Sequence, residues 1–414
     1  MMGERHGIFA TCLFFLSILL SRGCVRNRLA IEQVSWAINE SRIHVGELQS
    51  VNSSTSLSKT NQSFSISLSN RNSSLSSDHL CSRDEIRIGF WKQVILDSPP
   101  YLPRTVHLQC YPDSEYNANQ WMHTHEWQPN ASSSTDCTFT DWDPNEYCKL
   151  MRRATILIIG DSLSFEHYRS LGHLLGIHIS QFSQHESKKE QKNIVNYACR
   201  KQTRIVYRRD DLLSNVSDAI FGGKTFPQVI VMNRGAHYQN DTMLMTGMQK
   251  VVKELIDWKL QCEIFNITCH LLWRTSVPGH PNCEKNHFHH PVNDIHAMEA
   301  LVNDRSNYNN RTIQYHWFDY QHQNELVVDM LTKQEILQQE MSTPFFLEII
   351  DAYYLNMLRP DEHRAHQGDC LHSCYPGKMD VYSQLLLHFL KIQRSQTDID
   401  SMIAWQENRT MLRY

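Results

Sequence analysis

The clearest pattern in the chain is a continuous apolar run, Ile156–Ile159, that stops at Gly160 and is followed by helical spacing at Phe165–Leu175. Such a run, bounded by turn residues, is typical of a strand buried on both faces, as in a parallel sheet covered by helices. Glycine allows a tight reversal because it has no Cβ. We therefore expect a strand, a tight turn and a helix, with Ser162 in the first helical turn.

The alternation of strand-like and helix-like segments continues towards the C-terminus. The expected strands are Arg204–Tyr207, Gln228–Met232, Thr268–Trp273 and Thr312–Phe318, and the expected helices are Met243–Leu260, Pro291–Asn303 and Val381–Leu390. This order favours an α/β fold with a doubly wound, mostly parallel sheet. Ligands bind beyond the carboxyl ends of the strands in such sheets. We expect Ser162, Asn233 and Arg274 at those ends.

The first 80 residues follow a different pattern. The apolar run Ile8–Leu20 is shorter than the roughly 20 residues that span a bilayer comfortably, so residues 1–26 are either a signal-anchor or a signal peptide. No small-x-small cleavage site follows the run, which favours the anchor. Residues 51–79 contain twelve serines and no tryptophan, tyrosine or cysteine. Such a composition buries too little apolar surface to fold, and we expect residues 27–80 to be a disordered stem.

The remainder is expected to be one folded domain, 81–395, followed by a tail, 396–414. Residues 81–150 are rich in aromatic residues, proline and turn residues, which predicts an irregular, disulfide-tied layer on the α/β core, 151–395. Ten cysteines lie in this domain, and in a secreted context they predict up to five disulfides whose pairing the sequence leaves open.

The net charge and the glycosylation sequons indicate what class of protein this is. The net charge is −4 and no basic patch with interleaved aromatic residues is present, which argues against a nucleic-acid partner. Ten Asn-x-Ser/Thr sequons behind an apolar N-terminal run indicate a lumenal glycoprotein.

A second chemically informative segment lies near the C-terminus, where Asp369 and His372 precede Pro376-Gly377 and the last expected helix. Together with Ser162 they meet the needs of nucleophilic catalysis: the serine attacks, the histidine takes its proton, and the carboxylate orients the imidazole. A structural alternative exists for each: Ser162 as a helix N-cap, and Asp369 and His372 as caps of the last helix.

These motifs resemble those of the PC-esterase branch of the GDSL/SGNH superfamily, and within it the trichome-birefringence-like O-acetyltransferases, which are Golgi type II proteins. The main matches are Gly160-Asp161-Ser162, the block Asp369–Gly377 and the block Arg359–His363 before it. Supporting matches are Cys81 with Gly89-Phe90-Trp91, Asn233-Arg234-Gly235 with His237, Trp273-Arg274-Thr275 and Pro278-Gly279-His280. The similarity covers roughly Cys81 to Lys391.

The resemblance implies an SGNH-like three-layer fold and a Ser162–His372–Asp369 triad. It implies an oxyanion hole formed by the Ser162 N–H and the Asn233 side-chain amide, and substrate contacts from Arg274, His280 and His237. SGNH enzymes usually supply a further oxyanion donor from a glycine in this part of the chain. In this sequence residues 177–221 contain no glycine, which is a departure from that pattern. An amide or arginine within Tyr197–Arg209 is expected to replace it.

The function implied is transfer of an acetyl group to a glycan hydroxyl through an acyl-enzyme, on a single-pass Golgi membrane protein or a secreted one. The acetyl donor is a co-substrate such as acetyl-CoA or an acetylated intermediate, and no bound cofactor is expected. Two alternatives stay open: an acetylesterase with the same triad, and a non-catalytic glycan-binding protein. The histidines of segment 280–296 lack a metal-binding spacing such as Glu-x-x-His, so no metal is expected.

Overall fold

The computed structural model describes residues 80–95, 123–129, 137–177, 193–234, 237, 240–286, 288–310, 312–334, 345–364 and 368–393. They all belong to one compact unit, Ser76–Tyr414. The expected anchor, nearly all of the expected stem and the expected tail lie outside the described residues. Within the described ranges, no helix is both long enough and apolar enough to cross a bilayer.

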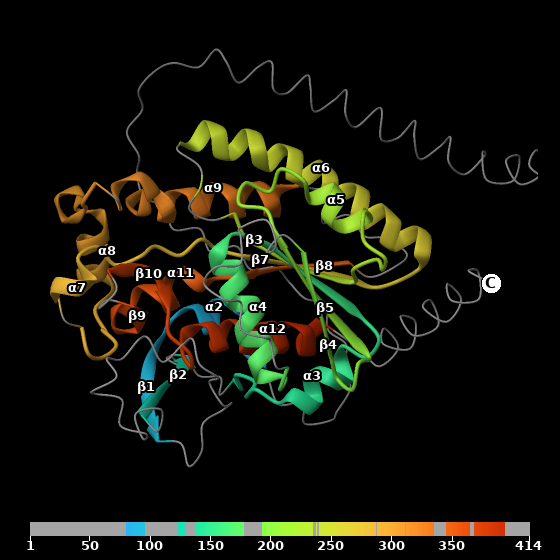
Figure 1. The fold of residues 1–414 in the computed structure, drawn as a ribbon, viewed down its shortest axis with the longest axis horizontal. Helices are drawn as coiled ribbons and strands as arrows, with labels where there is room; N and C mark the ends of the chain where they lie inside the picture. The colour runs from blue at the N-terminus through green and yellow to red at the C-terminus, as the bar shows by residue number, and fades with distance from the viewer. Residues whose placement is uncertain are drawn as a thin grey trace, which may run out of the picture. The chain divides into compact units, whose positions relative to one another are not determined.

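A six-stranded sheet forms the centre of this unit, with the strand order β4-β5-β3-β6-β7-β8 (Figure 1). The strands are β3 (Thr155–Gly160), β4 (Asn193–Ala198), β5 (Thr203–Arg209), β6 (Val229–Met232), β7 (Cys269–Arg274) and β8 (Phe345–Ile350). All neighbours pair in parallel except β4, which runs antiparallel to β5 at one edge. The expected α/β fold with a mostly parallel sheet is therefore present.

Helices cover both faces of the sheet. One layer holds α3 (Pro144–Leu150), α4 (Ser162–Leu174) and α12 (Lys378–Gln393), and the other holds α5 (Val216–Phe221), α6 (Asp241–Phe265) and α9 (Tyr320–Lys333), as Figure 1 shows. Side chains of a strand alternate between its faces. Ile156 and Ile158 of β3 accordingly enter the core under α4 and α12, while Leu157 and Ile159 enter the core under α6. This double burial explains the continuous apolar run.

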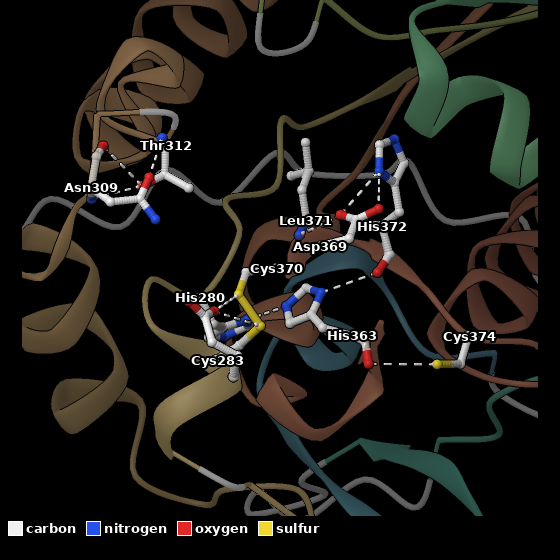
Figure 2. The surroundings of a disulfide bond; sticks show 11 residues. His280, Cys283, Asn309, Thr312, His363, Asp369, Cys370, Leu371, His372 and Cys374 are labelled. Carbon is white, nitrogen blue, oxygen red and sulfur yellow. Dashed lines mark hydrogen bonds and ion pairs between the residues drawn. A yellow bond between two sulfur atoms is a disulfide. The ribbon is translucent and has the colours of Figure 1, made fainter. Parts of the chain in front are cut away.

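The expected strand Thr312–Phe318 is wrong. The segment forms two 3-10 turns, η5 (Ile313–Tyr315) and η6 (Trp317–Asp319), with His316 between them at a left-handed φ of 52°. The Asn309 side chain accepts a hydrogen bond from the Thr312 N–H at 3.0 Å and starts the turn, a contact drawn in Figure 2. The edge position of the sheet is taken instead by β8.

The described residues of the range 81–150 are more regular than expected. They contain α2 (Arg83–Arg87), an antiparallel pair formed by β1 (Gly89–Ile95) and β2 (His123–Pro129), and α3. Trp91 and Trp127 meet edge to face at 5.5 Å and are both buried, so these tryptophans form a local core. The expected disulfide tie is present as Cys81–Cys137.

The remaining elements gather near the carboxyl ends of the strands. They are α7 (Cys283–Asn286), α8 (Ile295–Asn303), η4 (Arg305–Asn307), α11 (Ala352–Met357), η7 (Pro360–Glu362), β9 (His363–Arg364) and β10 (Asp369–Ser373). Further described disulfides are Cys148–Cys199, Cys262–Cys269 and Cys283–Cys370. Cys374 is also disulfide-bonded. The prediction of a disulfide-rich domain is confirmed.

Candidate active site

The turn between β3 and α4 presents Ser162 at the start of the helix. Gly160 has a φ of 148°, a left-handed conformation that side chains with a Cβ rarely adopt. Asp161 is the N-cap of α4, because its carboxylate accepts the Leu163 N–H at 3.0 Å. Ser162 is therefore not the cap, and its hydroxyl is left for other chemistry.

Ser162, His372 and Asp369 form a continuous chain of hydrogen bonds. His372 Nε2 lies 2.9 Å from Ser162 Oγ, and His372 Nδ1 lies 2.9 Å from Asp369 Oδ2. Figure 2 shows the Asp369 carboxylate and the His372 ring facing each other. A carboxylate accepts only, so Nδ1 carries the proton and Nε2 is left to take one from the serine. The structure brings together the three residues that the sequence singled out.

The alternative role of Asp369 and His372 as caps of the last helix is wrong. Both lie on β10, and the backbone at the start of α12 is bound by other carboxylates: Glu362 accepts the Lys378 N–H at 2.7 Å and Asp380 accepts the Gly377 N–H at 3.1 Å.

Electrostatics around the pair favour a carboxylate and a basic imidazole. Burial raises the pKa of Asp369, but hydrogen bonds from the His372 ring and from the backbone N–H groups of His372 and Leu371 outweigh it, so this pKa lies well below its usual range. Burial lowers the pKa of His372, but the bond to Asp369 and the charges of Glu166 and Asp369 raise it above its usual value. Asp369 therefore stays ionised at neutral pH.

A buried ionic cluster supports the turn that follows β10. Arg359 forms ion pairs with Asp361 and Glu362, and Glu362 in turn binds the start of α12. Breaking a buried pair of this kind leaves an uncompensated charge, which is strongly destabilising. The Arg359–His363 block thus supports β9 and β10.

Two buried imidazoles lie between this block and β10. His280 Nδ1 lies 2.6 Å from His363 Nε2, and His363 Nδ1 lies 3.2 Å from the His372 carbonyl oxygen, a chain visible in Figure 2. Burial lowers the pKa of His280 to about 3 and that of His363 well below its usual value. Both rings are therefore neutral at physiological pH and carry one N–H each, so two of the three contacts made by these rings, with each other and with the Met357 and His372 carbonyl oxygens, are hydrogen bonds.

His280 and Arg274 do not occupy the substrate-contacting positions expected of them. His280 is fully buried, and its second ring nitrogen lies 2.9 Å from the Met357 carbonyl oxygen. Arg274 is 1% exposed, contacts Ser164 Oγ through Nη2 at 3.2 Å and lies over the Tyr382 ring at 5.5 Å. Both are side chains of the interior that hold elements together.

Asn233 lies at the end of β6, as expected, but its amide nitrogen has other acceptors. It donates to the Arg274 carbonyl oxygen at 2.8 Å and lies 3.3 Å from Ser276 Oγ. In this arrangement the Asn233 amide does not serve as an oxyanion donor. The Ser162 N–H, by contrast, has no acceptor among the described residues.

Three of the four arginines within Tyr197–Arg209 have other partners. Arg204 binds Thr225, Arg208 binds Asp218, and Arg209 forms a two-pronged ion pair with Asp211 at 2.9 and 3.2 Å. None of these contacts is with the triad, so the replacement for the missing glycine donor stays a prediction.

His237 lies near Asp161, the residue before Ser162, and its expected contact with substrate stays a prediction. Its Nε2 lies 3.9 Å from Asp161 Oδ2 and 3.8 Å from Asp211 Oδ2, and its side chain is 34% exposed. Asp161 directly precedes Ser162, and Arg209 pairs with Gly160 across β3 and β5. Arg209, Asp211 and His237 therefore form a polar group of side chains next to Asp161, which we call the polar rim.

One group of potential metal ligands lies close to the site. Atoms of Cys283, Glu284 and Cys370 lie within 4.8 Å of one another. The two sulfurs, however, are bonded to each other, so they are not thiolate ligands. The disulfide instead ties β10 to α7, next to Asp369 (Figure 2).

Glu166 is the residue near the triad that the sequence patterns missed. It is buried on α4, and its carboxylate contacts β9 and β10. Its position four residues after Ser162 was the available signal, because residues four apart share a helix face.

No protein-family model and no curated protein sequence matches the chain. The case for a function therefore comes from the geometry of the site and from the motifs in the sequence.

Proposed function

We propose that this protein is an O-acetyltransferase of the PC-esterase, SGNH-like type, which moves an acetyl group through Ser162 to a glycan hydroxyl. The observation that carries the proposal is the hydrogen-bond chain from Ser162 Oγ through His372 to Asp369. The acetyl group and the glycan acceptor come from the motif resemblance to trichome-birefringence-like O-acetyltransferases.

In the first half-reaction, Ser162 Oγ attacks the carbonyl carbon of the acetyl donor and gives its proton to His372 Nε2. The oxyanion forms near the Ser162 N–H and the positive end of the α4 dipole, which stabilise negative charge. His372 then protonates the leaving group, and an acetyl ester on Ser162 remains. The donor is a co-substrate such as acetyl-CoA or an acetylated intermediate.

In the second half-reaction, an acceptor hydroxyl gives its proton to His372 Nε2 and attacks the acetyl ester. The tetrahedral intermediate collapses, the proton returns from His372 to Ser162 Oγ, and the acetylated acceptor leaves. Asp369 keeps the Nδ1 proton in place and stabilises the imidazolium in both halves.

The polar rim of Arg209, Asp211 and His237 supports a hydroxyl-rich acceptor. A carboxylate held by an arginine offers hydrogen-bond acceptors in a fixed orientation, and the guanidinium and the imidazole offer donors. Sugar hydroxyls donate and accept, so this combination suits them. The rim lies beside Asp161, immediately before the nucleophile.

The disulfides and sequons support a lumenal site of action. Disulfides persist in oxidising compartments, and four are present in the described part of the chain. Together with the expected signal-anchor, this supports a single-pass Golgi membrane protein with a lumenal catalytic domain, or its secreted form.

The transfer proposal is tested by following where the acetyl group goes. The full chain is incubated with an activated acetyl ester and a panel of polysaccharides, and acetylated glycan and free acetate are both measured. We expect at least one glycan to take up acetyl at the expense of free acetate. Release of acetate alone, unchanged by every glycan, would identify an acetylesterase, and no acetyl turnover at all would leave a glycan-binding protein.

A further inference from the structure

Glu166 lies on α4 one helical turn after Ser162. Residues four apart in a helix lie on the same face, so its side chain projects towards β10 from the helix that carries the nucleophile. It is only 4% exposed, and carboxylates are almost never buried to this degree without partners.

The partners of Glu166 belong to β10, the strand that carries Asp369 and His372, and to β9, which pairs with it. Its Oε1 binds Arg364 Nη2 at 2.9 Å, and its Oε2 accepts the Ser373 N–H at 3.1 Å. Arg364 Nη2 also donates to the Ser373 carbonyl oxygen at 3.3 Å. The Glu166–Arg364 ion pair thus binds both polar backbone groups of the residue that follows His372.

This attachment falls where the pairing of β9 and β10 is irregular. β9 and β10 pair at Asp369–Arg364 and at Ser373–His363, and the register shifts between these two pairs. His372 lies inside the irregular interval, so a regular ladder does not fix its backbone. A bond from α4 to Ser373 fixes that backbone relative to Ser162.

We propose that Glu166 is a positioning residue of the catalytic centre, which with Arg364 ties the nucleophile helix to the strand that carries His372 and holds Ser162 and His372 at reacting distance. This inference rests on the acyl-enzyme function proposed above. A second tie supports the same geometry, because the Tyr375 hydroxyl donates to the Glu166 carbonyl oxygen at 2.8 Å.

The two members of the ion pair act oppositely on the catalytic histidine. Besides burial, the charges that act on His372 are those of Asp369 on β10, Glu166 on α4 and Arg364 on β9; the carboxylates raise its pKa and Arg364 lowers it. His363 on β9 also faces His372 and is neutral. Around Glu166 itself lie Arg364, Arg274 on β7, and Tyr375, with Lys378 and Tyr382 from α12.

The experiment compares Glu166→Gln and Arg364→Gln in the full chain, with the hydrolysis of an activated acetyl ester as the readout. His372 must be neutral to act as a base, so activity falls as pH drops through its pKa. Glu166→Gln removes a charge that raises this pKa and shifts the acid limb to lower pH, whereas Arg364→Gln shifts it to higher pH. We expect both variants to lose kcat by roughly tenfold to a hundredfold, with little change in KM, because the triad geometry loosens.

The matched control is Glu254→Gln on α6. Glu254 also accepts a backbone N–H, that of Ser217 at 3.1 Å, and also pairs with a cation, Lys250. It lies in the opposite helix layer, so its removal leaves kcat and the pH profile unchanged.

The inference is overturned if the wild-type protein turns over the ester while both variants keep its kcat, or if both acid limbs move in the same direction. If Glu166→Gln does not fold, the shift of the acid limb to higher pH in Arg364→Gln tests the inference on its own. Failure of the proposed function looks different, because the wild-type protein itself then shows no turnover that depends on Ser162.

Discussion

Asp369→Asn is expected to lower kcat for acetyl transfer by roughly 10⁴-fold with little change in the fold. The amide is almost the same size as the carboxylate, but its NH₂ group donates towards His372 Nδ1, where the carboxylate accepts. The imidazole then carries its proton on Nε2, opposite Ser162 Oγ, and is unable to take the serine proton. The side chains of the triad keep their positions, but His372 no longer acts as the base.

This prediction is checked by steady-state kinetics of Asp369→Asn, with circular dichroism to verify the fold. Asp329→Asn is a suitable control, because Asp329 is an exposed carboxylate on α9 that pairs with Lys333. A loss of less than tenfold in Asp369→Asn would show that this carboxylate does not set the His372 tautomer.

Removal of the Cys283–Cys370 disulfide is expected to lower the free energy of unfolding by about 4–5 kcal/mol. The bond joins cysteines 87 residues apart, and in the chain-entropy account a cross-link restricts the unfolded chain more when it closes a longer loop. The His280 N–H also donates to the Cys370 carbonyl oxygen at 2.9 Å, a contact that does not depend on the disulfide.

The comparison within the molecule is Cys262–Cys269, which closes a loop of only 7 residues. Double alanine variants of each bond are unfolded in urea, and the loss for the short loop is expected to be about 2–3 kcal/mol. Because Cys370 adjoins Asp369, the Cys283/Cys370 variant is also expected to lose acetyl transfer, while the Cys262/Cys269 variant keeps it. Equal losses of stability would contradict the loop-length explanation.

The regular part of the fold follows from local patterns. The continuous apolar run at Ile156–Ile159 predicts β3, because a central strand of a covered sheet needs apolar side chains on both faces. The helical spacing before residue 261 predicts α6, although the helix continues to Phe265 because Asn266 ends it in a left-handed conformation. Periodicity identifies such elements and places their ends only approximately.

The secondary-structure predictions fail where contacts with neighbouring residues determine the local structure. Thr312–Phe318 has the β-branched and aromatic residues of a strand, yet the Asn309 side chain starts a turn there and Trp317 is buried against Tyr308 and Tyr315. Strand propensity describes how a side chain fits a pleated surface and gives way to such local hydrogen bonds.

The sequence predicts which residues of the site carry the chemistry, but it predicts less well where their side chains point. Ser162, Asp369 and His372 were identified from residue types and motifs, which fix what each group can do. A position at a strand end indicates where a residue lies but not where its side chain points, and Arg274 points into the core. Glu166 was missed because its partners, Arg364 and Ser373, lie about 200 positions further along the chain.

In the proposed mechanism Ser162 carries the acetyl group between the two half-reactions, so an acetyl ester is expected on its side chain. The full chain is mixed with an activated acetyl ester, quenched in acid and digested, and the peptide that contains Ser162 is analysed by mass spectrometry. The predicted result is one acetyl group on Ser162 in the wild-type protein, and neither adduct nor acetyl transfer in Ser162→Ala. Undiminished acetyl transfer by Ser162→Ala would show that Ser162 is not the nucleophile.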